Sequence, residues 1–325
     1  MENTKTLHAS IEGKKRVDLF LRESTGMSRA KIQRLIDEGE VFINSFPVKA
    51  YSQKVKNGDT IEYSEELPAT FDLKSADIPL NVIYEDENML VVNKQTGLVV
   101  HPALGHAEDT LVNAIFGKYV KQEDFRPDDT RPGIVHRLDK DTSGAILIAK
   151  NAQALDQLAE LFKKKQIKKE YLCLVHGVIE EEGYLSTLID RDIHNRKKFT
   201  TRNLKGKQAQ TIFAPLEKFY STTLLSVKIL TGRTHQIRVH MNYIRHNVIG
   251  DEYYGDKTRD LQLLTYLGYS KESYRDVMPR QMLHAYRLEF INPFTKQEMH
   301  LVAEPPADFN GLLDKLRKKY NEIIR

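Results

Sequence analysis

Residues 133–150 read "GIVHRLDKDTSGAILIAK", a charged stretch followed by an apolar one. Its last part, "AILIAK" from Ala145, is mostly apolar and predicts a buried strand, and the "TSG" at 142–144 predicts a tight polar turn ahead of that strand. Before the turn, Asp139 follows Arg137 by two residues, a spacing that does not bring two side chains together on a helix. The stretch therefore predicts a carboxylate in a loop that leads into a buried strand.

Short apolar runs recur on both sides of this stretch. Residues 81–94, "NVIYEDENMLVVNK", predict two strands joined by a polar turn, and residues 170–179 and 224–230 predict one strand each. Helical patterns occur at residues 110–120, 151–165, 234–244 and 305–324. Because several strands follow one another without a helix between them, we expect an α+β fold with a mixed, largely antiparallel sheet and not a doubly wound one.

A smaller unit with helices and strands is expected at residues 14–63. Its first helix is predicted around Val17–Leu21, and its second runs from Ser28, a capping residue, to Gly39, where a left-handed residue commonly ends a helix. The buried stripe of the second helix is predicted to be Ile32, Leu35 and Ile36. Its solvent side carries the basic residues Arg29, Lys31 and Arg34.

These patterns divide the chain into four parts. We expect an N-terminal tail at residues 1–13, the small unit at 14–63, an acidic and proline-bearing linker at 64–79, and a large domain at 80–325. The single cysteine, Cys173, excludes a disulfide framework and a cysteine-rich zinc site. With no apolar run long enough for a membrane span and no secretory signal, the sequence predicts a cytoplasmic protein, which we expect to be a monomer.

The formal net charge of the chain is only +4, but its basic residues are clustered. Runs of Lys and Arg lie at residues 163–171 and 191–207, and they add to the basic face of the second helix in the small unit. Together the three clusters favour a polyanionic partner.

Several kinds of site are unsupported by the motifs present. The histidines at 101, 106, 136, 235 and 240 lack the helical spacing of a zinc hydrolase, and "TSGA" is not a nucleophile elbow. Neither glycine-rich phosphate fingerprint occurs. We therefore expect no metal, no nucleotide and no other cofactor.

Asp139 is the candidate reactive group. A carboxylate in a charged stretch is usually a structural ion-pair partner, but Asp139 lies beside a predicted buried strand, and Arg238 lies on a predicted helix with an apolar face. A carboxylate that an arginine keeps ionised in a partly desolvated pocket can act as a nucleophile or as a general base at a sugar carbon.

Two resemblances to known families add to this reading. The segment from "RVDLFL" at residue 16 to "NGDTI" at residue 61 resembles the small RNA-binding domain named after the fourth protein of the small ribosomal subunit, except that Ser45 stands where glycine is usual. The motifs "GIVHRLDKDTSG", "KKEYLCLVHG", "LTGRTHQIRVHM" and "GDEYYG" resemble the catalytic domain of the RluA-type pseudouridine synthases. The loop at residues 93–117 is most similar to the subgroup typified by large-subunit ribosomal RNA pseudouridine synthase D, although Gln95 replaces a common proline.

The second resemblance implies a site and a reaction. It implies that Asp139 is the essential catalytic carboxylate, that Arg238 pairs with it, and that Tyr171 stacks on the uracil and helps to remove its C5 proton. It implies that Arg137 displaces the target base from its stack, and that His136 belongs to the same substrate-binding loop. Asp139 has three roles open to it: attack on C1′, attack on the base, or removal of a 2′ proton. The isomerisation of uridine to pseudouridine needs no cofactor.

The resemblances also imply an RNA partner, most of all large-subunit ribosomal RNA. Arg29, Lys31 and Arg34 are then expected to contact phosphates without reading sequence. Two alternatives stay open at this point: a non-catalytic RNA-binding factor for ribosome assembly, and a metal-dependent hydrolase that acts on RNA.

Overall fold

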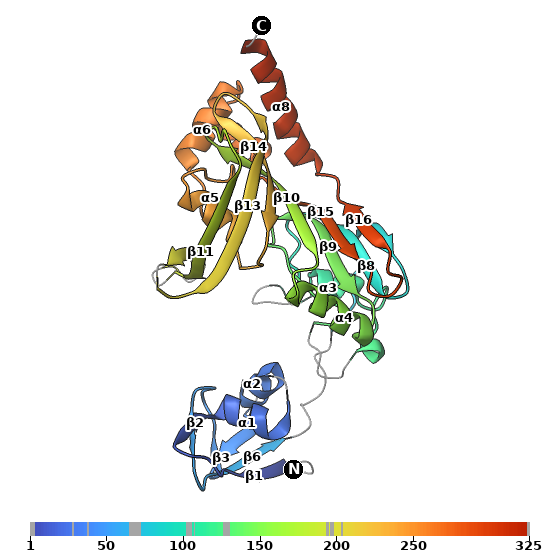
Figure 1. Ribbon diagram of the computed structural model, residues 1–325, viewed down its shortest axis with the longest axis vertical. Coiled ribbons are helices and arrows are strands. Elements are labelled where there is room, and N and C mark those ends of the chain that lie inside the picture. The colour runs from blue at the N-terminus through green and yellow to red at the C-terminus, as the bar shows by residue number, and fades with distance from the viewer. Residues whose placement is uncertain are drawn as a thin grey trace. The chain divides into compact units, whose positions relative to one another are not determined.

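The computed structural model resolves two compact units, the first ending at Leu73 and the second beginning at Lys74 (Figure 1). The residues described are 4–27, 29–37, 39–64, 73–101, 106, 108–125, 131–192, 195, 198–202 and 204–323. None of the helices within these ranges is long and apolar enough to cross a membrane.

The N-terminal unit packs two helices on small antiparallel sheets. Helices α1 (Val17–Thr25) and α2 (Arg29–Asp37) lie beside a four-stranded sheet ordered β1-β6-β3-β4 and a two-stranded sheet of β2 and β5. The strands are β1 (Thr4–His8), β2 (Lys14–Arg16), β3 (Val41–Ile43), β4 (Phe46–Pro47), β5 (Lys54–Lys56) and β6 (Thr60–Ser64). Both predicted helices are present.

The expected stripe of α2 forms part of the core of this unit: Ile32 and Leu35 are fully buried and Ile36 nearly so. Gly39 has a φ of +76°, as predicted for a residue that ends a helix, whereas Ser28, the predicted cap, lies outside the described residues. Strand β1 was not expected, because its exposed residues give little apolar pattern. It pairs with β6, so part of the predicted tail belongs to the unit.

The larger unit is built on one curved sheet whose order is β12-β11-β13-β14-β10-β15-β9-β8-β7, with β16 paired to β15. Every neighbouring pair is antiparallel except β15 and β9, which confirms the predicted mixed, largely antiparallel α+β fold. Its strands are β7 (Asn81–Glu85), β8 (Met89–Lys94), β9 (Ser143–Ala149), β10 (Lys168–His176), β11 (Gly183–Arg191), β12 (Phe199–Arg202), β13 (Lys207–Lys218), β14 (Thr222–Ile229), β15 (Leu283–Ile291) and β16 (Glu298–Val302).

The helices of this unit are α3 (Leu111–Ile115), α4 (Ala152–Lys163), α5 (Gln236–Tyr243), α6 (Lys257–Tyr266), α7 (Tyr274–Val277) and α8 (Ala307–Ile323), with short 3-10 turns at Gln122–Asp124 and Lys271–Ser273. Helix α3 is shorter than the predicted 110–120, because Phe116 is extended and Gly117 takes a φ of +78°. Helix α5 starts two residues late, because His235 at its N-terminus is left-handed. Strands β11 and β13, which alternate partly exposed residues, were not predicted.

Part of the predicted linker packs on the larger unit. The backbone N–H of Ala76 donates to the carbonyl of Asn113, and the Asn113 side chain donates to the carbonyl of Lys74. Residues 65–72 lie outside the described ranges.

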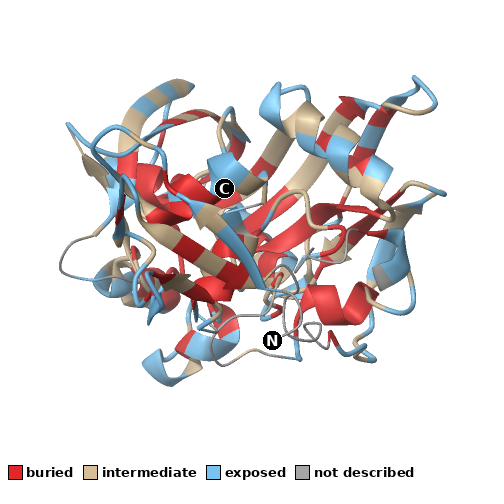
Figure 2. Ribbon diagram, turned by 90° about the horizontal axis from the view of Figure 1, so that it is seen from below, coloured by how far each residue is buried: buried red, intermediate tan, exposed pale blue. Residues whose placement is uncertain are grey.

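Burial concentrates in the middle strands of the large sheet (Figure 2). All seven residues of β9 are buried, as the run "AILIAK" predicted. Where β9 begins, it runs so close to β15 that a Cβ on Gly144, whose φ is +117°, would lie 2.2 Å from the carbonyl oxygen of Ala285. The loop that carries Asp139 is therefore anchored at the centre of the sheet.

Candidate active site

Asp139 and Arg238 meet at the start of β9 and the N-terminal half of α5. Arg238 Nη1 donates to Asp139 Oδ2 at 3.0 Å, although 99 residues separate the two in sequence. The Asp139 side chain is 19% exposed and that of Arg238 only 3%. The loop holds its own shape through a turn in which the N–H of Thr142 donates to the carbonyl of Asp139. The expected pairing of this carboxylate with Arg238 is thus present in the structure.

A second carboxylate fixes the guanidinium. Asp251 is fully buried and accepts from Arg238 Nε at 2.6 Å and from Nη2 at 2.8 Å. The same carboxylate accepts from the backbone N–H groups of Tyr253 and Tyr254. Burial opposes the charge, but the hydrogen bonds and charges of Asp251 and Asp139 raise the pKa of Arg238. This bidentate grip leaves Nη1 free to hold Asp139 in one orientation.

Aromatic rings enclose the ion pair. The guanidinium lies 5.7 Å from the ring centre of Tyr253 and 5.1 Å from that of Tyr254. Tyr254 Oη accepts from the backbone N–H of Phe199 and lies 2.8 Å from His235 Nδ1. Among the described residues the phenol has no other acceptor, so its O–H donates to Nδ1, which places the imidazole proton on Nε2.

His235 thereby presents an N–H beside the carboxylate. Its Nε2 lies 3.9 Å from Asp139 Oδ2, too far for a direct hydrogen bond. Burial lowers the pKa of His235, which keeps the ring neutral. A neutral N–H donor and a carboxylate thus line the same wall.

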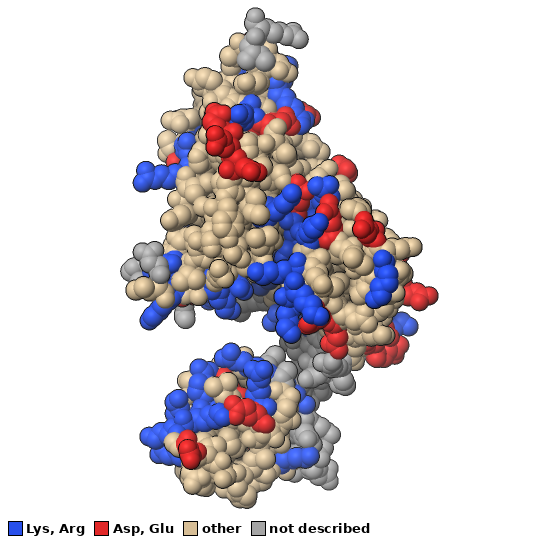
Figure 3. All heavy atoms as spheres, in the orientation of Figure 1, with Lys and Arg blue, Asp and Glu red and all other residues tan. Residues whose placement is uncertain are grey.

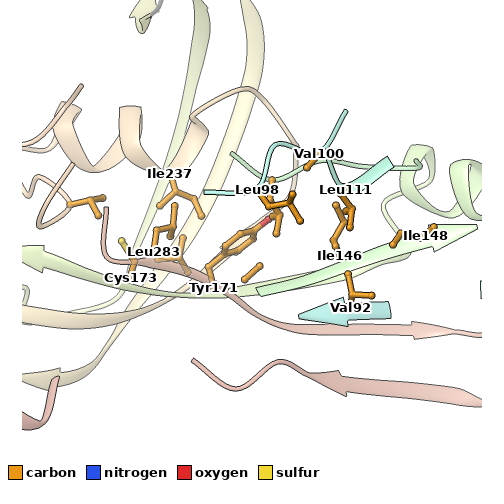
Figure 4. Close-up of a cluster of buried hydrophobic side chains, with 14 of the residues drawn as sticks. Val92, Leu98, Val100, Leu111, Ile146, Ile148, Tyr171, Cys173, Ile237 and Leu283 are labelled. Atoms are coloured by element: carbon orange, nitrogen blue, oxygen red, sulfur yellow. The ribbon is translucent and has the colours of Figure 1, made fainter. Parts of the chain in front are cut away.

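Tyr171 lies in both the core and the site. It is only 7% exposed and packs among Leu98, Ile237 and Leu283 (Figure 4). Burial first, and then the charge of Asp139, raise the pKa of the phenol. The phenol oxygen therefore keeps its proton at neutral pH, and the side chain presents an apolar ring with one hydroxyl.

These groups line a pocket of about 300 Å³, here called the reaction pocket. Its wall includes Asp139, Tyr171, His235, Arg238 and Arg137, the last of which is exposed. A pocket of this size is at the lower end of small-molecule sites. It offers one carboxylate, one aromatic ring and several donors to a planar ligand.

A buried lysine, Lys94, is hydrogen-bonded to the loop that carries Asp139. Lys94 is fully buried, and its amine donates to the carbonyls of Gln95, Leu98 and Lys140 at 2.8 to 3.0 Å. Burial lowers the pKa of this amine to about 7, with smaller opposing contributions from Asp141 and Asp139. The loop at 93–97 is thus joined directly to the residue that follows Asp139.

His136 lines the reaction pocket, but its ring is engaged within the protein. Its Nε2 accepts from the backbone N–H of Leu147 at 2.8 Å, and the ring packs on Phe162 with their centres 4.7 Å apart. Burial, helped by the charge of Lys169, lowers the pKa of His136 to about 3. The geometry therefore assigns it to bracing the loop.

The predicted RNA contacts of the N-terminal unit are placed only in part. Arg29 is half-exposed and lies 3.4 Å from the buried Asp18 carboxylate. Lys31 lies two residues further along α2 and is partly exposed. The Arg34 side chain lies outside the described residues.

Sequence reasoning missed Asp251, His235 and Tyr254 as members of the site. All three occur in motifs quoted above, "TGRTHQIRVHM" and "GDEYYG". The usable signal was the Gly-Asp pair that follows helix α5, since an acidic residue near a buried arginine is its natural partner.

Residues 88–243 match the family described as RNA pseudouridylate synthase, and residues 15–61 match the S4 domain. An uncharacterized RNA pseudouridine synthase of Chlorobaculum parvum is 39% identical, over 95% of this chain and 96% of the relative. The ribosomal large subunit pseudouridine synthase D of Vibrio cholerae is 34% identical, over 98% of this chain and 96% of the relative.

A solved structure is similar as well. Human RNA pseudouridylate synthase domain containing 4 has a TM-score of 0.56 and 25% identity, and the match covers 73% of this chain and 93% of that one.

Proposed function

The chain belongs to the family of RNA pseudouridine synthases, and on that premise we propose that it isomerises uridines of large-subunit ribosomal RNA with Asp139 as the catalytic carboxylate. One observation carries the assignment of this residue: the Asp139 carboxylate lies in the wall of the reaction pocket and is held there by Arg238, which is itself fixed by Asp251.

The reaction breaks the bond between C1′ and N1 of uridine, turns the freed uracil, and joins C1′ to C5. The C5 proton is lost and N1 becomes protonated, so the composition does not change. Arg238 holds the Asp139 carboxylate in one orientation, so that it can act at C1′, at the 2′ proton or at the base. The buried phenol of Tyr171 is protonated, which favours its proposed role as a stacking surface for the detached ring.

The substrate must leave its helical or loop stack to enter a pocket of this kind, at a cost of a few kcal/mol. Arg137 is exposed at the pocket wall and has no hydrogen bond or ion pair with any described residue. We propose that it takes the place of the displaced base. The S4-like unit, with Arg29 and Lys31 on α2, is proposed to bind neighbouring RNA backbone.

The direct test is tritium release from large-subunit ribosomal RNA labelled at uracil C5, prepared from cells that lack this protein. We expect release by the wild type and loss of at least about a thousandfold in Asp139→Asn, because its amide cannot supply the negative charge. Asp141→Asn, in the same loop but outside the pocket lining, is the matched control and should retain activity.

Release that survives in Asp139→Asn would remove this carboxylate from the reaction. If the wild type releases no tritium from either free RNA or assembled subunits, the result would favour the non-catalytic assembly factor. Mapping the new pseudouridines would identify the site.

A further inference from the structure

A second and larger hollow adjoins the reaction pocket. It has a volume of about 760 Å³ and lies over the first residues of β10, the last residues of β14 and the end of α4. We call it the basic hollow. Phe162, Lys169 and Arg233 line both the hollow and the reaction pocket, so the two are continuous along this wall.

The basic hollow has an excess of positive charge. Two of its carboxylates are already neutralised: Glu170 pairs with Arg287, and Glu289 lies 3.3 Å from Arg287 Nε and 4.0 Å from Lys168 Nζ. The remaining cations on the wall include Lys165, Lys169, Lys228 and Arg233, and none of these has a carboxylate within ion-pair distance among the described residues.

Figure 3 shows Lys and Arg side chains gathered over the part of the larger unit where β10 and β15 run. The sequence had already singled out one source of this charge, the basic run at residues 163–171. A concave surface with unpaired cations on its wall is complementary to a polyanion.

Lys169 occupies the shared wall. It lies two residues before Tyr171 on β10, so both side chains point to the same face of the sheet. Its amine lies 5.4 Å from the ring centre of Phe162 and near Gly232. Within the described part of the chain it has neither a hydrogen-bond acceptor nor an anion. Burial lowers its pKa to about 8, as expected for a cation that lacks a counter-charge.

Resting on the function proposed above, we propose that the basic hollow holds the RNA strand next to the target uridine, and that the Lys169 amine binds a backbone phosphodiester of that strand. The continuity of hollow and pocket supplies the path, because a nucleotide extruded into the pocket stays covalently joined to its neighbours. The unpaired cations supply the charge complementarity. Phe162 adds apolar surface to the wall of the hollow.

The first arm of the test measures equilibrium binding of a short oligouridylate to the full chain over a range of salt concentrations, and it needs no catalysis. Lys169→Met should weaken binding about tenfold or more, and should reduce the slope of log K against log salt by about 0.7, the value for one phosphate contact with a single strand. Lys169→Arg should retain most of the affinity.

Lys315→Met is the matched control. Lys315 is also partly exposed and its amine lies 5.2 Å from the ring centre of Tyr269, but it lines neither the hollow nor the reaction pocket. It should leave both affinity and slope unchanged. An unchanged slope in Lys169→Met, or equal losses in the control, would overturn the proposal.

The second arm locates the contact. The RNA used here contains one uridine that the enzyme modifies. Each phosphodiester near this target is replaced in turn by a neutral methylphosphonate. One replacement should weaken binding by wild type about tenfold and add nothing further in Lys169→Met. Equal sensitivity of the two proteins at every linkage would contradict a direct contact.

The two proposals fail differently. If the wild type binds oligouridylate with the predicted dependence on Lys169 but releases no tritium, the hollow is an RNA site and the proposed reaction is wrong. If tritium is released and Lys169→Met binds like the wild type, the reaction stands and the hollow has another occupant. Stronger competition by an acidic peptide than by oligouridylate would also reject RNA as that occupant.

Discussion

Arg238 and Lys169 are two cations on the wall of the same pocket, the first buried and the second partly exposed, and their surroundings are opposite. Arg238 has two carboxylates, one of them bidentate, whereas Lys169 has no anion among the described residues. The difference indicates that the two cations have different roles. A cation whose partners are all internal fixes geometry, and a cation without an internal partner is available to the substrate.

The largest loss is expected when Arg238 loses its bidentate partner. Asp251→Asn leaves a buried guanidinium with one partly exposed carboxylate, and removal of one member of a buried ion pair costs about 3–5 kcal/mol. We expect that loss in the free energy of unfolding by denaturant, together with at least about a hundredfold loss of turnover. Asp314→Asn, on an exposed pair with Arg317, is the control and should change neither. Unchanged unfolding in Asp251→Asn would show that the pair is not structural.

The buried histidine His284 is expected to make the stability of the fold depend on pH. His284 has no exposed surface, and its two ring nitrogens bond to the Ser143 hydroxyl and the Ala303 carbonyl. Burial lowers its folded-state pKa to about 4, while the unfolded chain binds a proton near pH 6.5. Stability is therefore complete above pH 6.5 and is lost as the pH falls toward 4, by about 3 kcal/mol since one pH unit is worth about 1.4 kcal/mol.

The measurement is the free energy of unfolding from pH 7 to pH 4. His284→Gln should be less stable at neutral pH and should show a flatter curve below pH 6.5. His300→Gln, at an exposed position, should keep the slope of the wild type. Parallel curves for wild type and His284→Gln would contradict the assignment.

Arg238→Lys separates the effect of charge from that of orientation, because it keeps the positive charge and removes the forked guanidinium. A lysine cannot hold Asp251 with two hydrogen bonds and Asp139 with a third in the same geometry. We expect about a hundredfold loss in the single-turnover rate with little change in RNA affinity. A rate close to that of the wild type would mean that charge alone, without orientation, is sufficient.

A small effect on RNA binding is expected for Arg233, a second cation of the basic hollow. Arg233 lines both the basic hollow and the reaction pocket, and its Nε donates a hydrogen bond to the carbonyl of Gln208 at 2.9 Å. Arg233→Gln should weaken RNA binding by only a few-fold and leave the rate at saturating RNA unchanged, because other cations share the site. A lost rate at saturation would place Arg233 with Arg238 as a residue that fixes geometry.

The same contrast explains what the sequence could predict. The loop at residues 136–144 and strand β9 were predictable because an apolar run, a polar turn and a family motif coincide there. The pairing of Asp139 with Arg238 came from the resemblance, because 99 residues lie between them and no periodicity encodes that distance.

The rest depends on tertiary packing. Strands β11 and β13 were missed because their partly exposed residues give weak apolar patterns. The role of Asp251 depends on the turn after α5, where Val248 pairs with Val175 of β10 and the N–H of Ile249 donates to the carbonyl of Leu174, and no local pattern shows this. The basic hollow was suggested by one run of lysines, but its continuity with the reaction pocket follows from Phe162, Lys169 and Arg233 coming together from three separate segments.

The most direct test of this account measures two quantities, the single-turnover rate and the Kd, for Arg238→Lys and Lys169→Met on the same RNA. The account predicts a crossed result: Arg238→Lys loses rate and keeps affinity, while Lys169→Met loses affinity and keeps its rate at saturating RNA. If both variants lose rate and affinity together, the separation between a cation that fixes geometry and a cation that binds the substrate is wrong.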